Sequence, residues 1–277
     1  MADKPLRLDE IGYWSEVKLD IIRKYAKAYS TIMAKQRSIK GHVYVDAFAG
    51  AGTHISKATG QLVPGSPLNA LVITPPFTEL HLIDLDGGRA RRLRELTKDD
   101  SRVTVHEGDC NQLLLQDVFP RCQYREYRRA LCLLDPYRLN VSWDVLETAG
   151  KMGSVEVFYN FMIMDANRNV LWRDQSKIVP SEAARMDVVW PGWRSAAYRT
   201  THDLLGELEE KATNEDIAEA FRRRLEEVAG FAYVPPPMPM RNSRGAVVYY
   251  LYFASQNMTG AKIVGEIFDA YRSRGAV

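Results

Sequence analysis

The sequence predicts an α/β fold built on a mostly parallel sheet, in a single domain that spans residues 1–277. Strand-like runs recur along the chain with helical or charged segments between them, which is the pattern of βαβ units. A length of 277 residues suits one large domain with a substantial core. Several of the strands end in a polar residue, and ligands bind beyond the carboxyl ends of parallel strands. The sequence therefore predicts a ligand site at one edge of the sheet.

Composition narrows the class of protein. Hydrophobic residues make up 46% of the chain and charged residues 26%, which is ordinary for a globular protein. No apolar run approaches the roughly 18 residues of a membrane span, and the first residues lack the apolar core of a signal peptide. We therefore expect a cytoplasmic protein without membrane association. Cys110, Cys122 and Cys132 form no C-x-x-C pair, so we expect small buried side chains and no metal site.

The net charge is only +2, but the basic residues are unevenly spread. They gather in residues 18–40, 89–94 and 121–129. Each cluster can be a separately solvated helix face. The alternative is one combined surface that binds phosphates, so nucleic acid is a candidate partner.

The first elements lead into a glycine-rich turn. Apolar residues recur at helical spacing near the N-terminus, which predicts a helix over residues 12–36. Residues 43–45 are a β-branched and aromatic run, typical of a strand that is covered on both faces, and Asp46 follows it. The turn Gly50-Ala51-Gly52 lets a ligand approach the backbone, although a tight turn without a ligand is the alternative. A loop follows, and Ser66 is expected to cap the next helix.

Four further strands are predicted at residues 80–83, 103–106, 130–134 and 155–159. The polar groups that follow them are Asp84, Gly108-Asp109, Asp135-Pro136-Tyr137 and Asn160.

The C-terminal half departs from this alternation. Residues 164–230 predict a helical insertion, with Thr213 or Asn214 as the cap of its last helix. Prolines restrict residues 235–239 to a sheet edge, and together with a strand over residues 247–254 they predict an antiparallel hairpin. A final helix over residues 260–272 is expected to complete the fold.

The turn after the first strand excludes several ligand classes. The third glycine of a nicotinamide fingerprint and the lysine of a P-loop are missing. The chain also lacks H-E-x-x-H and G-x-S-x-G, so metalloprotease and hydrolase interpretations have no support. The remaining interpretation is a nucleoside ligand without a polyphosphate tail, and S-adenosylmethionine fits it.

Roles for the predicted cofactor residues follow from hydrogen-bonding chemistry. Asp46 and the glycine turn border the amino-acid end of the cofactor. Asp84 accepts from the ribose hydroxyls and Asp109 from the adenine amino group, because a carboxylate is an acceptor that faces donors. The full set of predicted cofactor-binding residues is Asp46, Phe48, Ala49, Gly50, Gly52, Asp84, Leu85, Asp109 and Cys110.

The run Asp46-Ala47-Phe48-Ala49-Gly50-Ala51-Gly52 resembles the first motif of class I S-adenosylmethionine-dependent methyltransferases, with phenylalanine in place of the first glycine. More narrowly, the chain is similar to the three-Cys-motif partner protein family. This resemblance implies a Rossmann-like class I methyltransferase fold with a seven-stranded sheet, and a partner protein with a cysteine motif related to radical S-adenosylmethionine enzymes. The other motifs that carry it are Trp14 with Lys18 and Tyr25, Gly65-Ser66-Pro67, Gly108-Asp109-Cys110-Asn111, Leu134-Asp135-Pro136-Tyr137 with Trp143, Asn160-Phe161 with Arg168, and Tyr252-Phe253-Ala254-Ser255.

The catalytic candidates are Asp135, Pro136 and Tyr137, which resemble a shortened form of the strand end in amino methyltransferases that act on bases. In those enzymes an acceptor oxygen binds the target amine and the aromatic ring stacks on the flipped base. A simple strand-ending turn is the alternative. Cytosine C5 methylation is excluded because none of the cysteines follows a proline.

Substrate contacts are expected from Arg138, Asn160 and Arg168. Arg138 replaces the family's usual glycine, so it can close the acceptor pocket or clamp a phosphate. The expected activity is methylation of a nucleobase amine or nucleotide. The alternatives are a non-catalytic partner module and a methyltransferase of small molecules or peptides.

Overall fold

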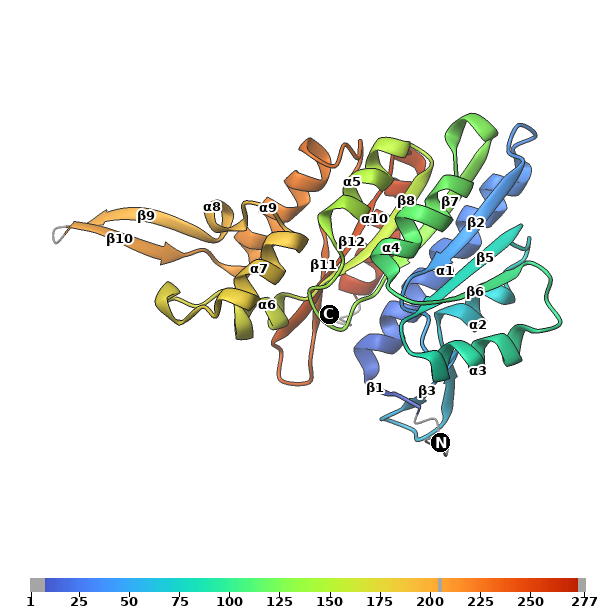
Figure 1. Ribbon diagram of the computed structural model, residues 1–277, viewed down its shortest axis with the longest axis horizontal. Coiled ribbons are helices and arrows are strands. Elements are labelled where there is room, and N and C mark those ends of the chain that lie inside the picture. Colours follow the sequence, from blue (N-terminus) through green and yellow to red (C-terminus); the bar gives the residue numbers. More distant parts are fainter. Residues whose placement is uncertain (1–7, 204–205, 274–277) are drawn as a thin grey trace.

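A seven-stranded sheet forms the centre of the computed structural model, which describes residues 8–203 and 206–273 (Figure 1). Five adjacent strands are parallel, and the last two along the chain pair antiparallel at one edge. The predicted α/β fold with a mostly parallel sheet and an antiparallel C-terminal hairpin is thus confirmed. In spatial order the strands are β11 (Met238–Arg241), β12 (Val247–Ala254), β8 (Val155–Phe161), β7 (Arg128–Leu134), β2 (Gly41–Asp46), β5 (Glu79–Asp84) and β6 (Val103–Glu107).

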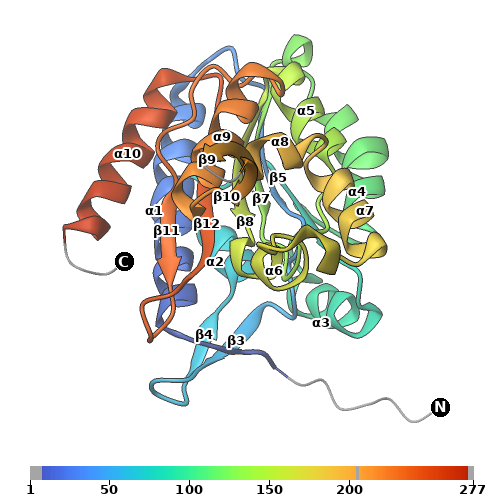
Figure 2. The ribbon, with the colours of Figure 1, turned by 90° about the vertical axis from the view of Figure 1, so that its left-hand side faces the viewer.

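Helices cover both faces of this sheet (Figure 2). One face packs against α1 (Tyr13–Lys35), α2 (Ser66–Leu71), α3 (Gly87–Thr97) and α10 (Met258–Arg272). The other face packs against α4 (Cys110–Leu113), a π-helical segment (Leu114–Val118), α5 (Trp143–Met152), α6 (Ile163–Asn169), α7 (Pro180–Val189), α8 (Trp193–Ala197) and α9 (Asn214–Glu227). Short 3-10 turns lie at Phe119–Arg121, Tyr124–Glu126 and Gln175–Lys177.

Strand β2 shows why the sheet lies in the centre. Side chains alternate along a strand, so a strand covered on both faces must be apolar throughout. Val43 and Val45 pack into the core of one face and Tyr44 into the core of the other, and all three are at most 1% exposed. The same strand places Asp46 at the carboxyl edge of the sheet.

The N-terminal half matches the prediction except around the glycine turn. Helix α1 begins and ends within one residue of the expected range. Ser66 is the first residue of α2 and Gly65 is its cap, since the carbonyl of Gly65 accepts the bond from Asn69 N–H. The expected loop instead contains β3 (Thr53–Ser56) and β4 (Leu62–Pro64), which form a separate small sheet with β1 (Glu10–Ile11).

The insertion is not purely helical. It also contains an antiparallel hairpin of β9 (Tyr198–Asp203) and β10 (Gly206–Lys211), which projects from the body of the molecule (Figure 1). The sequence gives little sign of it, because residues 207–211 lack the apolar alternation of a half-buried strand. The cap of α9 is Thr213, as predicted, and its hydroxyl accepts from Asp216 N–H at 3.1 Å.

The final helix begins two residues earlier than expected, after Asn257, whose side chain accepts from Thr259 N–H. Across residues 8–203 and 206–273, every helix is too short or too polar to cross a membrane.

Candidate functional site

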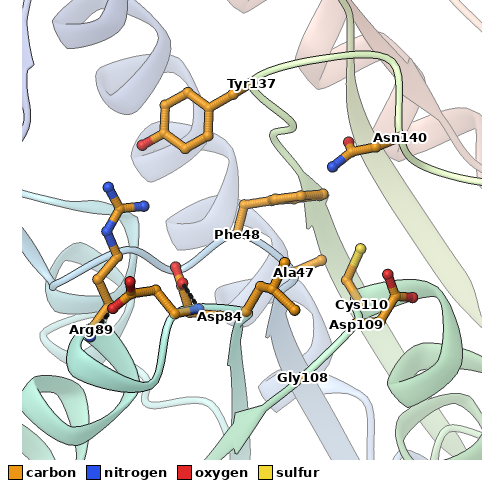
Figure 3. A pocket seen from close by; sticks show the side chains of 11 residues that line it. Ala47, Phe48, Asp84, Arg89, Gly108, Asp109, Cys110, Tyr137 and Asn140 are labelled. Carbon is orange, nitrogen blue, oxygen red and sulfur yellow. Dashed lines mark hydrogen bonds between the residues drawn. The ribbon is translucent and has the colours of Figure 1, made fainter. Parts of the chain in front are cut away.

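The predicted polar residues gather at the carboxyl edge of the sheet, where two neighbouring cavities open. The larger measures about 380 Å³ and the smaller about 230 Å³. Phe48 and Tyr137 line both cavities and therefore form their common wall (Figure 3). Among the predicted residues, the larger cavity also contains Asp84, Leu85, Asp109 and Cys110, and the smaller contains Ala49, Asp135 and Pro136.

Asp84 connects strand β5 to the glycine turn. Its Oδ2 accepts from Gly50 N–H and its Oδ1 accepts from Asp86 N–H, both at 2.8 Å. Gly50 has a φ of +64°, a conformation that glycine adopts without a steric penalty. Each carboxylate oxygen can accept more than one hydrogen bond. Asp84 is therefore oriented by the backbone and can still accept from a ligand in the cavity.

Asp109 caps helix α4. Its Oδ1 accepts from Asn111 N–H at 2.9 Å and from Gln112 N–H at 3.2 Å. The next residue, Cys110, is buried, and burial raises the pKa of its thiol to about 12, so the thiol stays protonated. All three cysteines are free and buried, as expected. No group of three metal-binding side chains occurs among the described residues.

Asp46 is fully buried at the end of β2. Its Oδ1 accepts from Phe48 N–H at 3.2 Å, while Oδ2 has no hydrogen-bond partner within the described ranges. Burial raises the pKa of Asp46 to about 7, although the nearby Ser66 hydroxyl, the Phe48 amide and the Lys18 charge oppose this rise. Near neutral pH, Asp46 therefore exchanges between the neutral and charged forms, and a cation beside it favours the charged form.

Asp135 is engaged on both oxygens. Lys18, from helix α1, forms an ion pair with Oδ2, and the side-chain amide of Asn160 donates to Oδ1. The Lys18 side chain is 9% exposed and lies 5.5 Å from the ring centroid of Tyr249. Asp135 is thus held as a paired carboxylate, whereas the sequence predicts an acceptor directed at a substrate amine.

No site role is predicted for Lys18, although its position in the sequence indicates that it has a buried partner. It lies four residues after Trp14 and seven before Tyr25, on the apolar stripe of α1. A charged residue on such a stripe needs a buried partner.

Several buried polar atoms near this ion pair lack partners within residues 8–203 and 206–273. They are Oδ2 of Asp46, Oδ1 of Asn160 and the Tyr249 hydroxyl. An unsatisfied buried group costs about 1–3 kcal/mol, and such groups are rare in native proteins. A ligand at this edge of the sheet could satisfy these three atoms.

A bridge of side chains spans the mouth of the larger cavity. The Tyr137 hydroxyl donates to Oδ2 of Asp9 at 3.0 Å, and Arg89 donates to the same carboxylate at 2.9 Å and 3.1 Å. Arg89 also lies 5.9 Å from the Tyr137 ring centroid. Sequence patterns do not link Asp9 to a site, because its partners are about 80 or more positions away in the chain.

Six predicted site residues line neither cavity: Asp46, Gly50, Gly52, Arg138, Asn160 and Arg168. Arg138 and Arg168 are exposed, and Asn160 contacts the site only through Asp135. Gly52 also lies outside, with a φ of +82°, and an added Cβ there would meet Leu93 and Leu96 of α3 at 3.2–3.3 Å. Its role is therefore to let the turn pack closely against the helix.

Comparisons with known proteins give only distant likenesses. No family model matches the chain, and no curated protein matches it. A solved structure of a Legionella pneumophila protein is 11% identical over 91% of this chain and 90% of that chain, with a TM-score of 0.48. An S-adenosylmethionine-dependent methyltransferase from Clostridium acetobutylicum is 8% identical over 86% of this chain and 91% of that chain, with a TM-score of 0.40. Another from Leishmania major is 8% identical over 87% of this chain and 82% of that chain, with a TM-score of 0.37. All three TM-scores lie below 0.5, so these likenesses carry no argument about the activity of this chain.

The Lys18–Asp135 ion pair is expected to stabilise the fold. Lys18→Met and Asp135→Asn should each lower the free energy of unfolding by about 2–3 kcal/mol, because each leaves a largely buried group unpaired. The double variant should lose less than the sum, and urea titration measures all three. Lys98→Met, which breaks the exposed pair with Glu95, is the control and should change stability by about 0.5 kcal/mol or less. Strict additivity would contradict a coupled pair.

Proposed function

We propose that the two cavities together bind S-adenosylmethionine and that the protein is a methyltransferase. The observation that supports this most directly is the placement of carboxylates along two neighbouring cavities at the carboxyl edge of a Rossmann-like sheet. The adenosine half suits the larger cavity, where Asp84 can accept from the ribose hydroxyls and Asp109 from the adenine amino group. The amino-acid half suits the smaller cavity, beside Ala49 and Asp46.

The charges in and beside the smaller cavity suit a zwitterion. Lys18 can interact with a ligand carboxylate, while the neighbouring buried Asp46 can attract an ammonium or sulfonium group. The unpartnered Oδ2 of Asp46 fits this assignment, because a cation there satisfies a buried acceptor. When bound, the cofactor supplies an electrophilic methyl group. The protein residues position the two ends and shield the reacting centre from water.

The proposed acceptor is a nucleobase amine or nucleotide. Tyr137 is 62% exposed on the wall between the cavities, so its ring offers a surface on which a base can stack. The attacking nitrogen forms a bond to the methyl carbon as the carbon–sulfur bond breaks, and the electron pair of that bond goes to sulfur. The proton that the nitrogen then releases can pass to the Asp135 carboxylate. Arg138 and Arg168, exposed at the same edge, can contact phosphates.

Two alternatives each have an observation in their favour. The pairing of Asp135 with Lys18 and Asn160 favours a non-catalytic module that retains the fold and associates with a three-Cys-motif partner protein in the cytoplasm. The modest volume of the smaller cavity, about 230 Å³, favours a small-molecule acceptor over a macromolecule.

Cofactor binding is the first test. Calorimetric titration should detect both S-adenosylmethionine and S-adenosylhomocysteine, and Asp84→Ala should weaken both at least tenfold by removing the ribose acceptor. Asp117→Ala, at an exposed carboxylate that lines neither cavity, is the control. The absence of heat or thermal shift at millimolar ligand would rule out the cofactor and leave the non-catalytic module.

The raised pKa of Asp46 makes the affinity pH-dependent. A cationic ligand needs the carboxylate form, and its binding lowers the Asp46 pKa, so affinity should increase as pH rises toward and past 7. One linked proton predicts roughly a tenfold gain between pH 6 and pH 7.5. Titration across this range measures it, and Asp46→Asn should remove most of the slope. An unchanged slope in that variant would assign the linked proton to another group.

The role of Asp135 is tested by turnover. With labelled cofactor and an acceptor fraction from mixed RNA, single-stranded DNA or small metabolites, Asp135→Asn should slow transfer by about 10²–10⁴-fold and barely change cofactor affinity. Lys18→Met keeps the carboxylate and should slow transfer less. Equal losses in both variants and in the double variant would show that Asp135 acts through the ion pair. Transfer to small metabolites alone would replace the nucleobase acceptor.

A further inference from the structure

We propose that the protein has a second ligand site, for a nucleotide, at the amino edge of the sheet and opposite the two cavities described above. A cavity of about 340 Å³ opens there between the end of α1, the starts of β7 and β8, and the start of α10. Its functional groups come from Tyr29, Tyr124, Arg129, Glu156, Tyr233 and Met258. This site is independent of the proposed methyl transfer.

The first component is a place for a phosphate. The Arg129 Nη1 group donates to the carbonyls of Tyr124 and Arg128, which fixes the guanidinium and leaves its other N–H groups for a ligand. Helix α10, which is 15 residues long, begins at Met258 on the same cavity. The first N–H groups of a helix lack intrahelical partners and attract anions. Arg129 and the start of α10 thus line the same cavity, and both favour an anion there.

The second component is a buried polar group that the fold does not use. Tyr29 is 2% exposed and lines the cavity, and its hydroxyl has no hydrogen-bond partner in the described part of the chain. The ring packs beside Phe77 and Tyr25, with centroid distances of 6.1 Å and 6.2 Å, and phenylalanine would pack equally well. The unsatisfied hydroxyl therefore lowers the free energy of unfolding, unless a ligand forms a hydrogen bond with it.

Glu156, also in this cavity, does not exclude an anion. Its carboxylate accepts hydrogen bonds from the hydroxyls of Tyr25 and Ser255. Burial raises the Glu156 pKa to about 7, which weakens its negative charge near neutral pH. Its remaining lone pairs suit the hydroxyl or amino donors of a nucleoside.

The third component is an aromatic and basic rim. Tyr124 is 57% exposed, and the Arg129 guanidinium lies 3.7 Å from its ring centroid. Tyr127 is 50% exposed and has a left-handed backbone with a φ of 59°, which is uncommon for a bulky residue. The Lys40 amine lies 5.6 Å from its ring centroid. Exposed aromatic rings beside cations are typical of surfaces on which nucleotide bases stack.

The rim also accounts for much of the uneven charge in the sequence. Exposed cations adjoin the lining residues in the chain on both sides of the cavity: Lys35, Arg37, Lys40 and Arg125. Part of the first basic cluster, residues 35–40, and part of the third therefore lie at the amino edge, whereas Lys18 of the first cluster lies at the carboxyl edge. The ligand is a phosphorylated nucleoside, either free or within a single-stranded nucleic acid.

The test uses the full chain with 5′-UMP and with an oligouridine decamer, each titrated by calorimetry. Arg129→Met should weaken UMP binding at least about tenfold, and Tyr29→Phe by several-fold, because each removes a donor to the ligand. The matched control is Arg121→Met, an exposed arginine outside the cavity, which should change UMP affinity less than about twofold. Tyr29→Phe keeps the packing of the ring, so it still tests the site if Arg129→Met unfolds the protein.

Comparing the two ligands shows whether the site binds a free nucleotide or a nucleotide within a nucleic acid. Equal affinity for UMP and the decamer identifies a free nucleotide, whereas tighter, salt-dependent decamer binding identifies nucleic acid. The site is overturned if neither ligand binds at millimolar concentration, or if Arg121→Met and Arg129→Met reduce binding equally, which indicates a diffuse basic surface. It is also overturned if Asp84→Ala abolishes UMP binding, which places the nucleotide in the larger cavity at the carboxyl edge.

Discussion

The ion pair between Lys18 and Asp135 is the interaction on which the carboxyl edge of the sheet depends. It joins the first long helix to the end of the fourth parallel strand across 117 positions of sequence. A largely buried charge is tolerated only with a partner, so α1 must cross the sheet at this point. Asn160 and the Tyr249 ring complete the surroundings of the pair. Helix, sheet and antiparallel hairpin therefore meet around one pair of charges.

Sequence predicted the main sheet because its strands are buried on both faces. Such strands are continuous apolar runs, and β2 and β8 are buried at every position. The small sheet of β1, β3 and β4 and the β9–β10 hairpin were not predicted. Their strands pair outside the main sheet, so burial imposes no apolar run on them. Residues 62–64 consequently read as part of a loop of mixed polarity, and residues 207–211 as part of a helical insertion.

The same reasoning separates predicted from missed site residues. Asp84, Asp109 and Asp135 follow parallel strands, and parallel topology brings strand ends to one edge whatever the rest of the chain does. Lys18, Asp9 and Arg89 reach the site from a helix, from the N-terminal segment and from α3. Their placement depends on helix packing and on contacts far apart in sequence. The apolar stripe of α1 indicates that Lys18 needs a buried partner, but no local pattern identifies that partner. Asp135 illustrates the limit, because its position was predictable and its Lys18 partner was not.

The two edges of the sheet differ in charge, and this difference constrains the order of binding. The carboxyl edge holds four carboxylates, those of Asp46, Asp84, Asp109 and Asp135. The nearby cations Lys18 and Arg89 are already paired with carboxylates and do not offset the remaining negative charge. Inside the cavities an anionic group of an acceptor therefore meets net repulsion until positive charge enters, although Arg138 and Arg168 outside them can contact its phosphates. In the proposed function, that charge is the sulfonium and ammonium of the cofactor beside Asp46. The cofactor should thus precede an anionic acceptor, whereas the basic amino edge attracts anions without it.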